Sequence, residues 1–248
     1  LTVFSKLPSK TSQISVLFFA AVRERAGTGF VQVAAFDGMT VDDAVDAACQ
    51  SAPRDPEPGT GVMLALNGEY VERDHPVDPG DEIAVIPPVS GGSDEITGDS
   101  EWIFLTSEQL DSLVLTEFVT TNVDGAVVTF IGVTRDHNQG RVVEHLDYEA
   151  YQPMAQNKML EIINEMRKRW SIGKIAVAHR TGRVDIGETS MVIAVGSPHR
   201  RPAFEACLYF VDRLKEVVPI WKKEIFEGGE VWIGETPGDG NSVEHRYK

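Results

Sequence analysis

Two adjacent glycines, Gly91 and Gly92, lie well inside the 248-residue chain, at the end of the segment Ile-Pro-Pro-Val-Ser-Gly-Gly. Because glycine has no Cβ atom, a segment that ends in this way can pass through a narrow channel and present its terminal carboxylate to an enzyme. That chemistry needs a free carboxyl group, whereas here Ser93 follows Gly92 through a peptide bond. The pair is therefore either a hinge between domains or the end of a carrier that cleavage between Gly92 and Ser93 must release.

Several cationic side chains could together bind a small anion. His199 and Arg200 follow an apolar segment and a Ser-Pro pair, just before a helical pattern, and a helix N-terminus would add unpaired N–H groups and a positive dipole. Lys215 and Lys222 are seven residues apart, which is two helical turns, but Pro219 is expected to end the helix between them. On residue type alone, each of these groups could equally be an ordinary solvated side chain.

The composition excludes several classes of protein. The chain has 23 Lys and Arg against 38 Asp and Glu, a net charge of −15, whereas nucleic-acid-binding proteins are normally basic. No apolar run is long enough to span a membrane, and no signal peptide is evident. Cys49 and Cys207 are far apart, which favours a reducing compartment and argues against a zinc site. We expect a cytoplasmic protein with no metal, no cofactor and no nucleic-acid or membrane partner.

The predicted strands and helices that carry these residues group into two domains. Residues 1–13 are predicted to be a flexible extension, and residues 14–92 to be the first domain. In that domain, apolar alternation and a Thr-Val-Asp-Asp helix start predict four strands and one helix, at 14–21, 30–36, 40–50, 63–66 and 83–86. Short strands around one helix indicate a ubiquitin-like β-grasp roll that ends in the Gly-Gly tail.

The polar, acidic residues 93–100 are predicted to be the linker, and residues 101–248 the second domain. This domain alternates apolar strands with amphipathic helices, at 126–133, 153–170, 175–179, 191–195 and 202–218. The order of these elements predicts an α/β sandwich with one helical layer, and so an α+β fold for the whole chain.

These motifs resemble the two subunits of molybdopterin synthase. The run Val-Leu-Phe-Phe-Ala-Ala-Val-Arg-Glu at 16–24 and the Pro-Pro-Val-Ser-Gly-Gly tail are similar to the small sulfur-carrier subunit. The second half resembles the large catalytic subunit, with matching segments at 125–130, 134–138, 197–200 and 214–224. The resemblance extends over about residues 14–92 and 100–235, and it implies a carrier domain fused to its catalytic domain.

The resemblance also implies the reaction and the partners. The carrier's last glycine, here Gly92, would become a thiocarboxylate and deliver sulfur to cyclic pyranopterin monophosphate, and two deliveries would form the dithiolene of molybdopterin. An adenylating and sulfurating enzyme would activate Gly92 after a protease has separated it from Ser93. The second domain would form a homodimer, heterotetramer-like after cleavage, in which the opposite subunit helps to line the pocket.

Individual roles follow from the positions that match. The catalytic residues would be Lys215 as general base or nucleophile, Lys222 as electrostatic stabiliser, His199 in acid/base chemistry or substrate binding, and Gly92 as the sulfur carrier. The substrate-binding residues would be Arg135, Arg200, Phe130, which shapes the entrance for the tail, and Glu224, which orients a lysine. Gly91 would keep the tail thin. Thr236 departs from the pattern, because relatives have an arginine near this position.

Two further interpretations stay open. The uncleaved chain could be an inactive scaffold or a regulatory fusion whose tail stays in the pocket, although such a protein would have no use for the cationic residues. The first domain could also be a sulfur carrier for thiamine-type synthesis, but the second half matches no thiazole-forming enzyme. The principal expectation is a precursor that is cut after Gly92.

Overall fold

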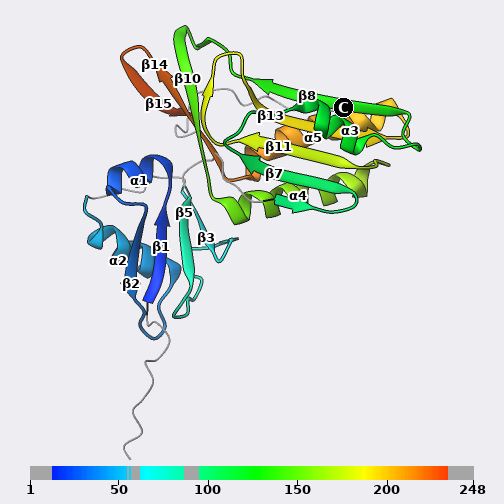
Figure 1. Ribbon diagram of the computed structural model, residues 1–248. Helices are drawn as coiled ribbons and strands as arrows, with labels where there is room; N and C mark the ends of the chain where they lie inside the picture. Colours follow the sequence, from blue (N-terminus) through cyan, green and yellow to red (C-terminus); the bar gives the residue numbers. More distant parts are fainter. Residues whose placement is uncertain (1–12, 55, 57–61, 87–94, 234–248) are drawn as a thin grey trace, which may run out of the picture.

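The computed structural model describes residues 13–54, 56, 62–86 and 95–233, which form two domains (Figure 1). The predicted flexible extension lies outside the described residues except for Gln13, which is the first residue of a strand. Four more positions that the sequence singles out lie outside them as well, namely Gly91, Gly92 and Ser93, which contain the proposed cleavage site, and Thr236.

The first domain is a five-stranded sheet with two helices. The strand order is β2-β1-β5-β3-β4, with β1 and β5 parallel at the centre and the other neighbours antiparallel. The elements are β1 (Gln13–Phe18), α1 (Ala20–Ala26), β2 (Phe30–Ala34), α2 (Val41–Ser51), β3 (Met63–Leu66), β4 (Glu69–Val71) and β5 (Glu82–Ile86). Helix α2 begins after Thr40, which exchanges hydrogen bonds with Asp43 in a capping box. The predicted ubiquitin-like roll is confirmed.

Two elements of this domain were not predicted. The strand expected at 14–21 ends at Phe18, and α1 follows because its apolar residues, including Val22 and Ala26, are buried at helical spacing. Gly27 then ends α1 in the left-handed conformation, with φ of 70°, which glycine adopts without strain. The second unpredicted element, β4, is a three-residue edge strand, too short to show an alternating pattern.

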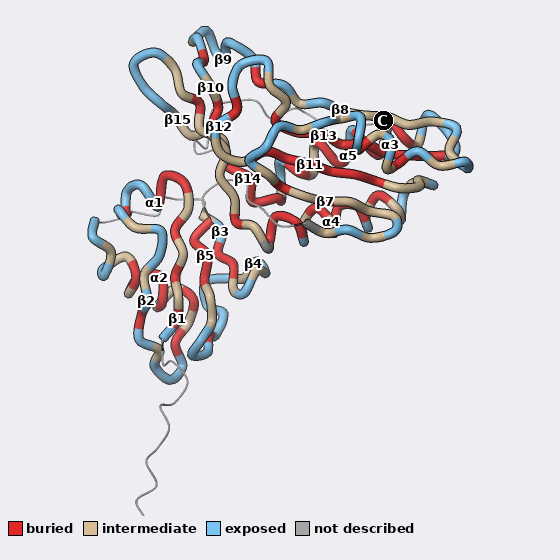
Figure 2. The backbone as a smooth tube through the Cα atoms, viewed as in Figure 1, coloured by how far each residue is buried: buried red, intermediate tan, exposed pale blue. Residues whose placement is uncertain are grey.

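The second domain is built on the sheet β6-β7-β11-β13-β8. Its elements are β6 (Glu95–Thr97), β7 (Glu101–Thr106), α3 (Ser112–Val119), β8 (Ala126–Val133), α4 (Gln152–Arg169), β11 (Ile175–Arg180), β13 (Thr189–Ser197) and α5 (Arg200–Val217). Alternate residues of β11 face opposite sides: Ile175 and Val177 pack with α4 and α5, whereas Ala176 and Ala178 pack with α3. Figure 2 shows β11 and β13 buried and β8 at an exposed edge.

Two expectations for this domain need correction. Residues 95–97, predicted to belong to the linker, form β6, which pairs antiparallel with β7 and places Ile96 opposite Ile103. Helices cover both faces of the sheet rather than one, because α3 packs against the face that carries small alanine side chains.

A second sheet, which the sequence analysis did not predict, stands beside the first. It has the order β12-β10-β14-β15, with β9 paired to β10. Its strands are β9 (His137–Asn138), β10 (Arg141–Ala150), β12 (Gly182–Asp185), β14 (Ile220–Phe226) and β15 (Gly229–Ile233). Charged side chains interrupt the apolar alternation of β10 and β14, and their pairing joins distant parts of the chain. This sheet carries most of the candidate site.

The two domains share a buried apolar cluster. Its members are Ala20, Ala65, Ala84 and Ile86 from the first domain and Tyr151, Met154 and Trp221 from the second. The Phe19 ring stacks on Trp221 with 5.4 Å between centroids. Reciprocal ion pairs flank the cluster, since Arg23 lies 2.7 Å from Glu149, and Lys223 pairs with Glu24. The first domain is therefore docked on the second within a single chain.

Candidate active site

A chain of polar contacts joins four side chains at the second sheet. The Glu224 carboxylate is buried, with 3% of the residue exposed. The Asn138 amide donates to both of its oxygens at 2.9 Å, and Arg135 Nη2 donates to Asn138 Oδ1 at 2.8 Å. Lys222 Nζ lies 3.4 Å from Glu224 Oε1. We call these four residues the relay; it unites Arg135, Lys222 and Glu224, three of the residues singled out from the sequence.

The strands explain why Lys222 and Glu224 meet. Both lie on β14 two residues apart, so their side chains leave the same face of the sheet. The pairing with β10 places them opposite Tyr148 and Leu146. The relay contains one carboxylate and two cationic side chains, Lys222 beside Glu224 and Arg135 beside Asn138, so it keeps a positive charge that can attract an anion. Because Lys222 is part-exposed, with 32% of its side chain accessible, its ammonium group can reach a bound molecule.

Tyr148 and His179 form the packed floor behind the relay. Their rings meet edge to face with 4.9 Å between centroids. Burial raises the pKa of Tyr148, a hydrogen bond with Ser190 opposes the rise, and the charge of Glu224 adds to it. Burial lowers the pKa of His179 to about 4, against a hydrogen bond of 2.7 Å between its Nδ1 and the Arg180 carbonyl. Both side chains are therefore neutral near pH 7 and act as support.

His199 and Arg200 lie elsewhere, at the N-terminus of α5. His199 is the N-cap residue, its backbone N–H donates to Ser197 Oγ at 3.3 Å, and its side chain makes no cap hydrogen bond. Both side chains are exposed. They line an open hollow of ≈ 710 Å³ together with Arg201, Phe204 and Glu205. The exposed N–H groups and two cations suit an anion, but no relay residue lines this hollow.

Lys215 lies in the last turn of α5 and is exposed. The helix ends at Val217, and β14 starts at Ile220, so the break expected at Pro219 is confirmed. His199 precedes Lys215 by sixteen residues, which corresponds to about 24 Å along a helix. One copy of the chain therefore cannot bring His199 and Lys215 to the same small molecule.

An apolar surface runs along the open edge of the domain. Phe130 is 37% exposed on β8, and its neighbour Ile131 is 43% exposed. Phe204 and Leu208 are more exposed, at 63% and 51%, on the outer side of α5, which packs against β8. Phe130, Phe204 and Leu208, here called the edge patch, are exposed to solvent in the single chain, whereas Ile131 points to the opposite face of the sheet.

The end of the first domain meets the strand that carries the relay. Ile86, the last described residue of that domain, is fully buried in the cluster that contains Trp221. Trp221 is the residue immediately before Lys222 on β14. The segment that leads to Gly91 and Gly92 therefore starts beside the relay strand.

Two residues with clear contacts received no role from the sequence. Asn138 belonged to a segment used for the family resemblance, but only its contact with Glu224, 86 residues away in sequence, reveals its place in the relay. Tyr148 lies on a strand that was not predicted.

Within the described ranges, no three His, Cys, Asp or Glu side chains are grouped so as to hold a metal ion. No helix in the described part of the chain is long and apolar enough to cross a membrane.

Comparison with known proteins identifies relatives of both domains. The family model described as MoaE protein matches residues 105–217, and the ThiS family model matches residues 16–92. The molybdopterin synthase catalytic subunit of Bacillus subtilis (strain 168) is 50% identical over 111 residues, which is 45% of this chain and 71% of that protein. The human molybdopterin synthase catalytic subunit is 40% identical over 154 residues, 62% of this chain and 82% of the relative.

A solved structure shows the same relationship for the second domain. The crystal structure of molybdopterin synthase from Staphylococcus aureus is 38% identical and has a TM-score of 0.52. The match extends over 56% of this chain and 99% of that one. The second domain thus corresponds to the whole of that protein chain, and the ThiS-family domain stands in front of it.

Proposed function

Because the chain belongs to the family of molybdopterin synthase catalytic subunits and carries a ThiS-family domain in front, we propose that it is a molybdopterin synthase made as one polypeptide. In this proposal, Gly92 carries the sulfur as a C-terminal thiocarboxylate. The acceptor is cyclic pyranopterin monophosphate, which receives two sulfur atoms to form the dithiolene.

The docked first domain is the observation that carries the proposal. Its last described residue, Ile86, shares a buried cluster with Trp221, next to Lys222. Six residues separate Ile86 from the end of Gly92, and an extended chain of that length reaches about 20 Å. In this proposal, a released tail of that length extends from the docked domain to the relay.

Sulfur transfer from an acyl group needs cations for the phosphate and for the charge that develops on the acyl oxygen. In the relay, Arg135 keeps guanidinium donors free for a phosphate, and Lys222 supplies the mobile positive charge. Glu224 orients Lys222, and Asn138 fixes Glu224 through both carboxylate oxygens. Lys215, in the last turn of α5, is assigned the proton transfer.

A second copy of the chain completes the site in this proposal. The length of α5 keeps His199 and Arg200 away from Lys215, so these two residues act on the substrate bound by the opposite copy. The edge patch supports this arrangement, because its exposed apolar side chains on β8 and α5 suit a contact between two copies. The assembly is then a homodimer of second domains that becomes heterotetramer-like once the chain is cut.

Cleavage between Gly92 and Ser93 is required for activity, since only a free carboxyl group can be adenylated and sulfurated. A protease and an activating enzyme are therefore expected partners in the cytoplasm. The alternative is an uncleaved scaffold or regulatory fusion. The interdomain ion pairs are compatible with this alternative, because they already join the two domains in the uncleaved chain.

Intact-mass spectrometry of the protein purified from its own cells tests the proposal. We expect two fragments, one ending at Gly92 and one beginning at Ser93, with part of the first heavier by the replacement of oxygen with sulfur. The purified fragments should convert cyclic pyranopterin monophosphate to molybdopterin. A single full-length mass, together with synthase activity of the uncut chain, would contradict the cleavage; a full-length mass without activity would favour the scaffold.

A further inference from the structure

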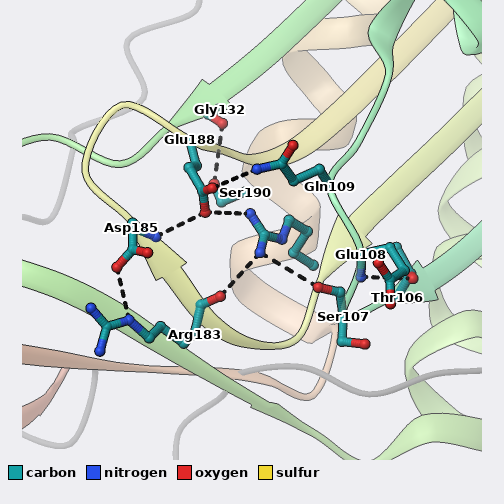
Figure 3. A network of polar contacts seen from close by, with 10 residues as sticks. Thr106, Ser107, Glu108, Gln109, Gly132, Arg183, Asp185, Glu188 and Ser190 are labelled. Atoms are coloured by element: carbon teal, nitrogen blue, oxygen red, sulfur yellow. Dashed lines mark hydrogen bonds and ion pairs between the residues drawn. The ribbon is translucent and has the colours of Figure 1, made fainter.

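A buried arginine outside the relay organises the turn between β12 and β13. Arg180, at the end of β11, is only 6% exposed. Its Nη1 donates to Glu188 Oε2 at 2.7 Å, and its Nη2 donates to the carbonyl oxygens of Arg183 (3.1 Å) and Ser107 (3.4 Å). Figure 3 shows this network around Glu188. The guanidinium thus connects Arg183 on β12 and Glu188 just before β13, on either side of the turn, to the loop that follows β7.

The Glu188 carboxylate is the centre of the network. Besides Arg180, it accepts hydrogen bonds from Gln109 Nε2 at 2.7 Å and from the Asp185 backbone N–H at 3.1 Å. The bond from Arg180 is the main reason that the pKa of Glu188 falls to about 2, and the other two bonds lower it further. The carboxylate therefore stays charged throughout the physiological range of pH.

The main chain of this turn holds the residue that precedes Arg135. The Thr134 backbone N–H donates to the Glu188 carbonyl at 3.0 Å, and the Gly187 N–H donates to the Thr134 carbonyl at 2.8 Å. Thr134 is 2% exposed. The ladder between β8 and β13 is irregular just before this point, between the Thr189 and Met191 pairs. Both peptide groups of Thr134 are thus fixed by the turn and not by regular strand pairing.

We propose that the turn held by Arg180 and Glu188 is a positioning device for Arg135. This inference rests on the proposed function, in which Arg135 binds the substrate phosphate. Asn138 is anchored separately, by the β9–β10 pairing and by Glu224. A change in the turn therefore moves Arg135 while leaving Asn138, Glu224 and Lys222 in place. Substrate binding should weaken, and the chemical step should not.

Gly187 offers a clean way to disturb the turn. Its φ is +82°, and a Cβ atom added there would meet no atom within 4 Å, so Gly187→Ala strains the backbone without a clash. Gly228, in the turn between β14 and β15, is a matched control: its φ is +89°, and its Cβ would also meet nothing. Arg180→Ala is less informative, because it removes a buried guanidinium together with its bonds to the Ser107 and Arg183 carbonyls, and this can unfold the domain.

Steady-state kinetics of the cleaved synthase is the first test, with the sulfur-loaded first domain supplied in excess because each transfer consumes one thiocarboxylate. For Gly187→Ala we expect KM for cyclic pyranopterin monophosphate to rise about tenfold, as when one charge-assisted hydrogen bond is lost, with kcat within about twofold. Gly228→Ala should change neither constant. In an Arg135→Ala background, Gly187→Ala should add no further rise in KM. Equal effects of the two glycine variants, or an additive effect on Arg135→Ala, would overturn the proposal.

Amide hydrogen exchange separates this inference from the proposed function. In Gly187→Ala, exchange at residues 134–136 should accelerate relative to the wild type, and in Gly228→Ala it should not. This readout needs no substrate or sulfur. A wild-type protein without synthase activity would count against the proposed function, while unchanged exchange in Gly187→Ala would by itself refute the positioning role.

Discussion

Glu224 on β14 and His199 at the start of α5 belong to the same domain, yet their surroundings are opposite. Glu224 is 3% exposed and is held by Asn138 and Lys222. His199 is exposed, and its side chain makes no cap hydrogen bond. The first region is organised by one chain alone, whereas the second is open to solvent beside an apolar surface.

This difference suggests how the work of catalysis is divided. A group that stabilises charge in a transition state is most effective when it is already oriented, because reorientation during the reaction costs free energy. The relay meets that condition through a buried carboxylate that aligns a lysine and an amide. The residues at the start of α5 lack such support, and the approach of a second copy would supply it. In the proposed dimer, the relay would be the closed half of a site, and His199 with Arg200 would be the open half.

The largest loss of activity is expected from a substitution of Lys222. Lys222→Ala should lower kcat by about 10²–10³-fold, as for other groups that stabilise developing charge. Its neighbour Lys223 is the matched control, because it pairs with Glu24 and Glu230 on the opposite face of β14. Lys223→Ala should lower kcat by less than about tenfold, through weaker domain docking. Equal losses in single-turnover assays of the two variants would contradict the assignment of the relay.

A smaller effect is expected from a fall in pH. It should lower the stability of the domain through the buried His179 behind the relay. Folding keeps His179 neutral, since burial lowers its pKa from 6.5 to about 4. Its contribution to stability is therefore complete above pH 6.5 and is lost as the pH falls from 6.5 to about 4, at most about 3 kcal/mol.

Urea unfolding at pH 7.5 and pH 4.5 measures this contribution. Tryptophan fluorescence is a suitable probe, because all 4 tryptophans lie in the second domain. His179→Asn keeps a donor for the Arg180 carbonyl but does not titrate, so this variant should lose less stability between the two pH values than the wild type does. Parallel losses in the two proteins would mean that His179 is not the acid-sensitive group.

The smallest effect is expected from His137, which neighbours the relay in sequence but not in contacts. Its side chain is 73% exposed and pairs with the similarly exposed Asp136. His137→Ala should change kcat and KM by less than about twofold, since exposed pairs contribute little. Asn138→Ala, one residue further on, leaves Glu224 without its two hydrogen bonds and should cost about tenfold or more in kcat. A larger loss of kcat in His137→Ala than in Asn138→Ala would mean that the substrate contacts His137 and not the relay.

The sequence could predict the elements whose patterns are local. Apolar strands such as β8 and β11, the helix α5 and its end before Pro219 all follow from apolar spacing and from proline chemistry. Lys222 and Glu224 could be singled out only through the family motif. Their partner Asn138 could not, because its role depends on a contact between residues 86 positions apart in the chain.

The second sheet escaped prediction for a related physical reason. Its strands β10 and β14 carry charged side chains toward the relay and the docked domain, so they lack the apolar alternation that marks a strand with one solvated face. Pairing between distant segments stabilises them instead. The separation of His199 from Lys215, in contrast, follows from the helix predicted at 202–218, which begins just after His199 and contains Lys215.

Mixing two inactive variants tests most directly whether the open half of one copy serves the closed half of another. His199→Ala and Lys222→Ala, carrying different affinity tags, would be co-expressed, and the doubly tagged dimers would be isolated and assayed with cyclic pyranopterin monophosphate. If the site is shared, each mixed dimer has one of its two sites with both residues intact, and the isolated mixed dimers should show about half of wild-type activity. If both residues act within one chain, every site has a defect, and mixed dimers no more active than either variant alone would contradict the account.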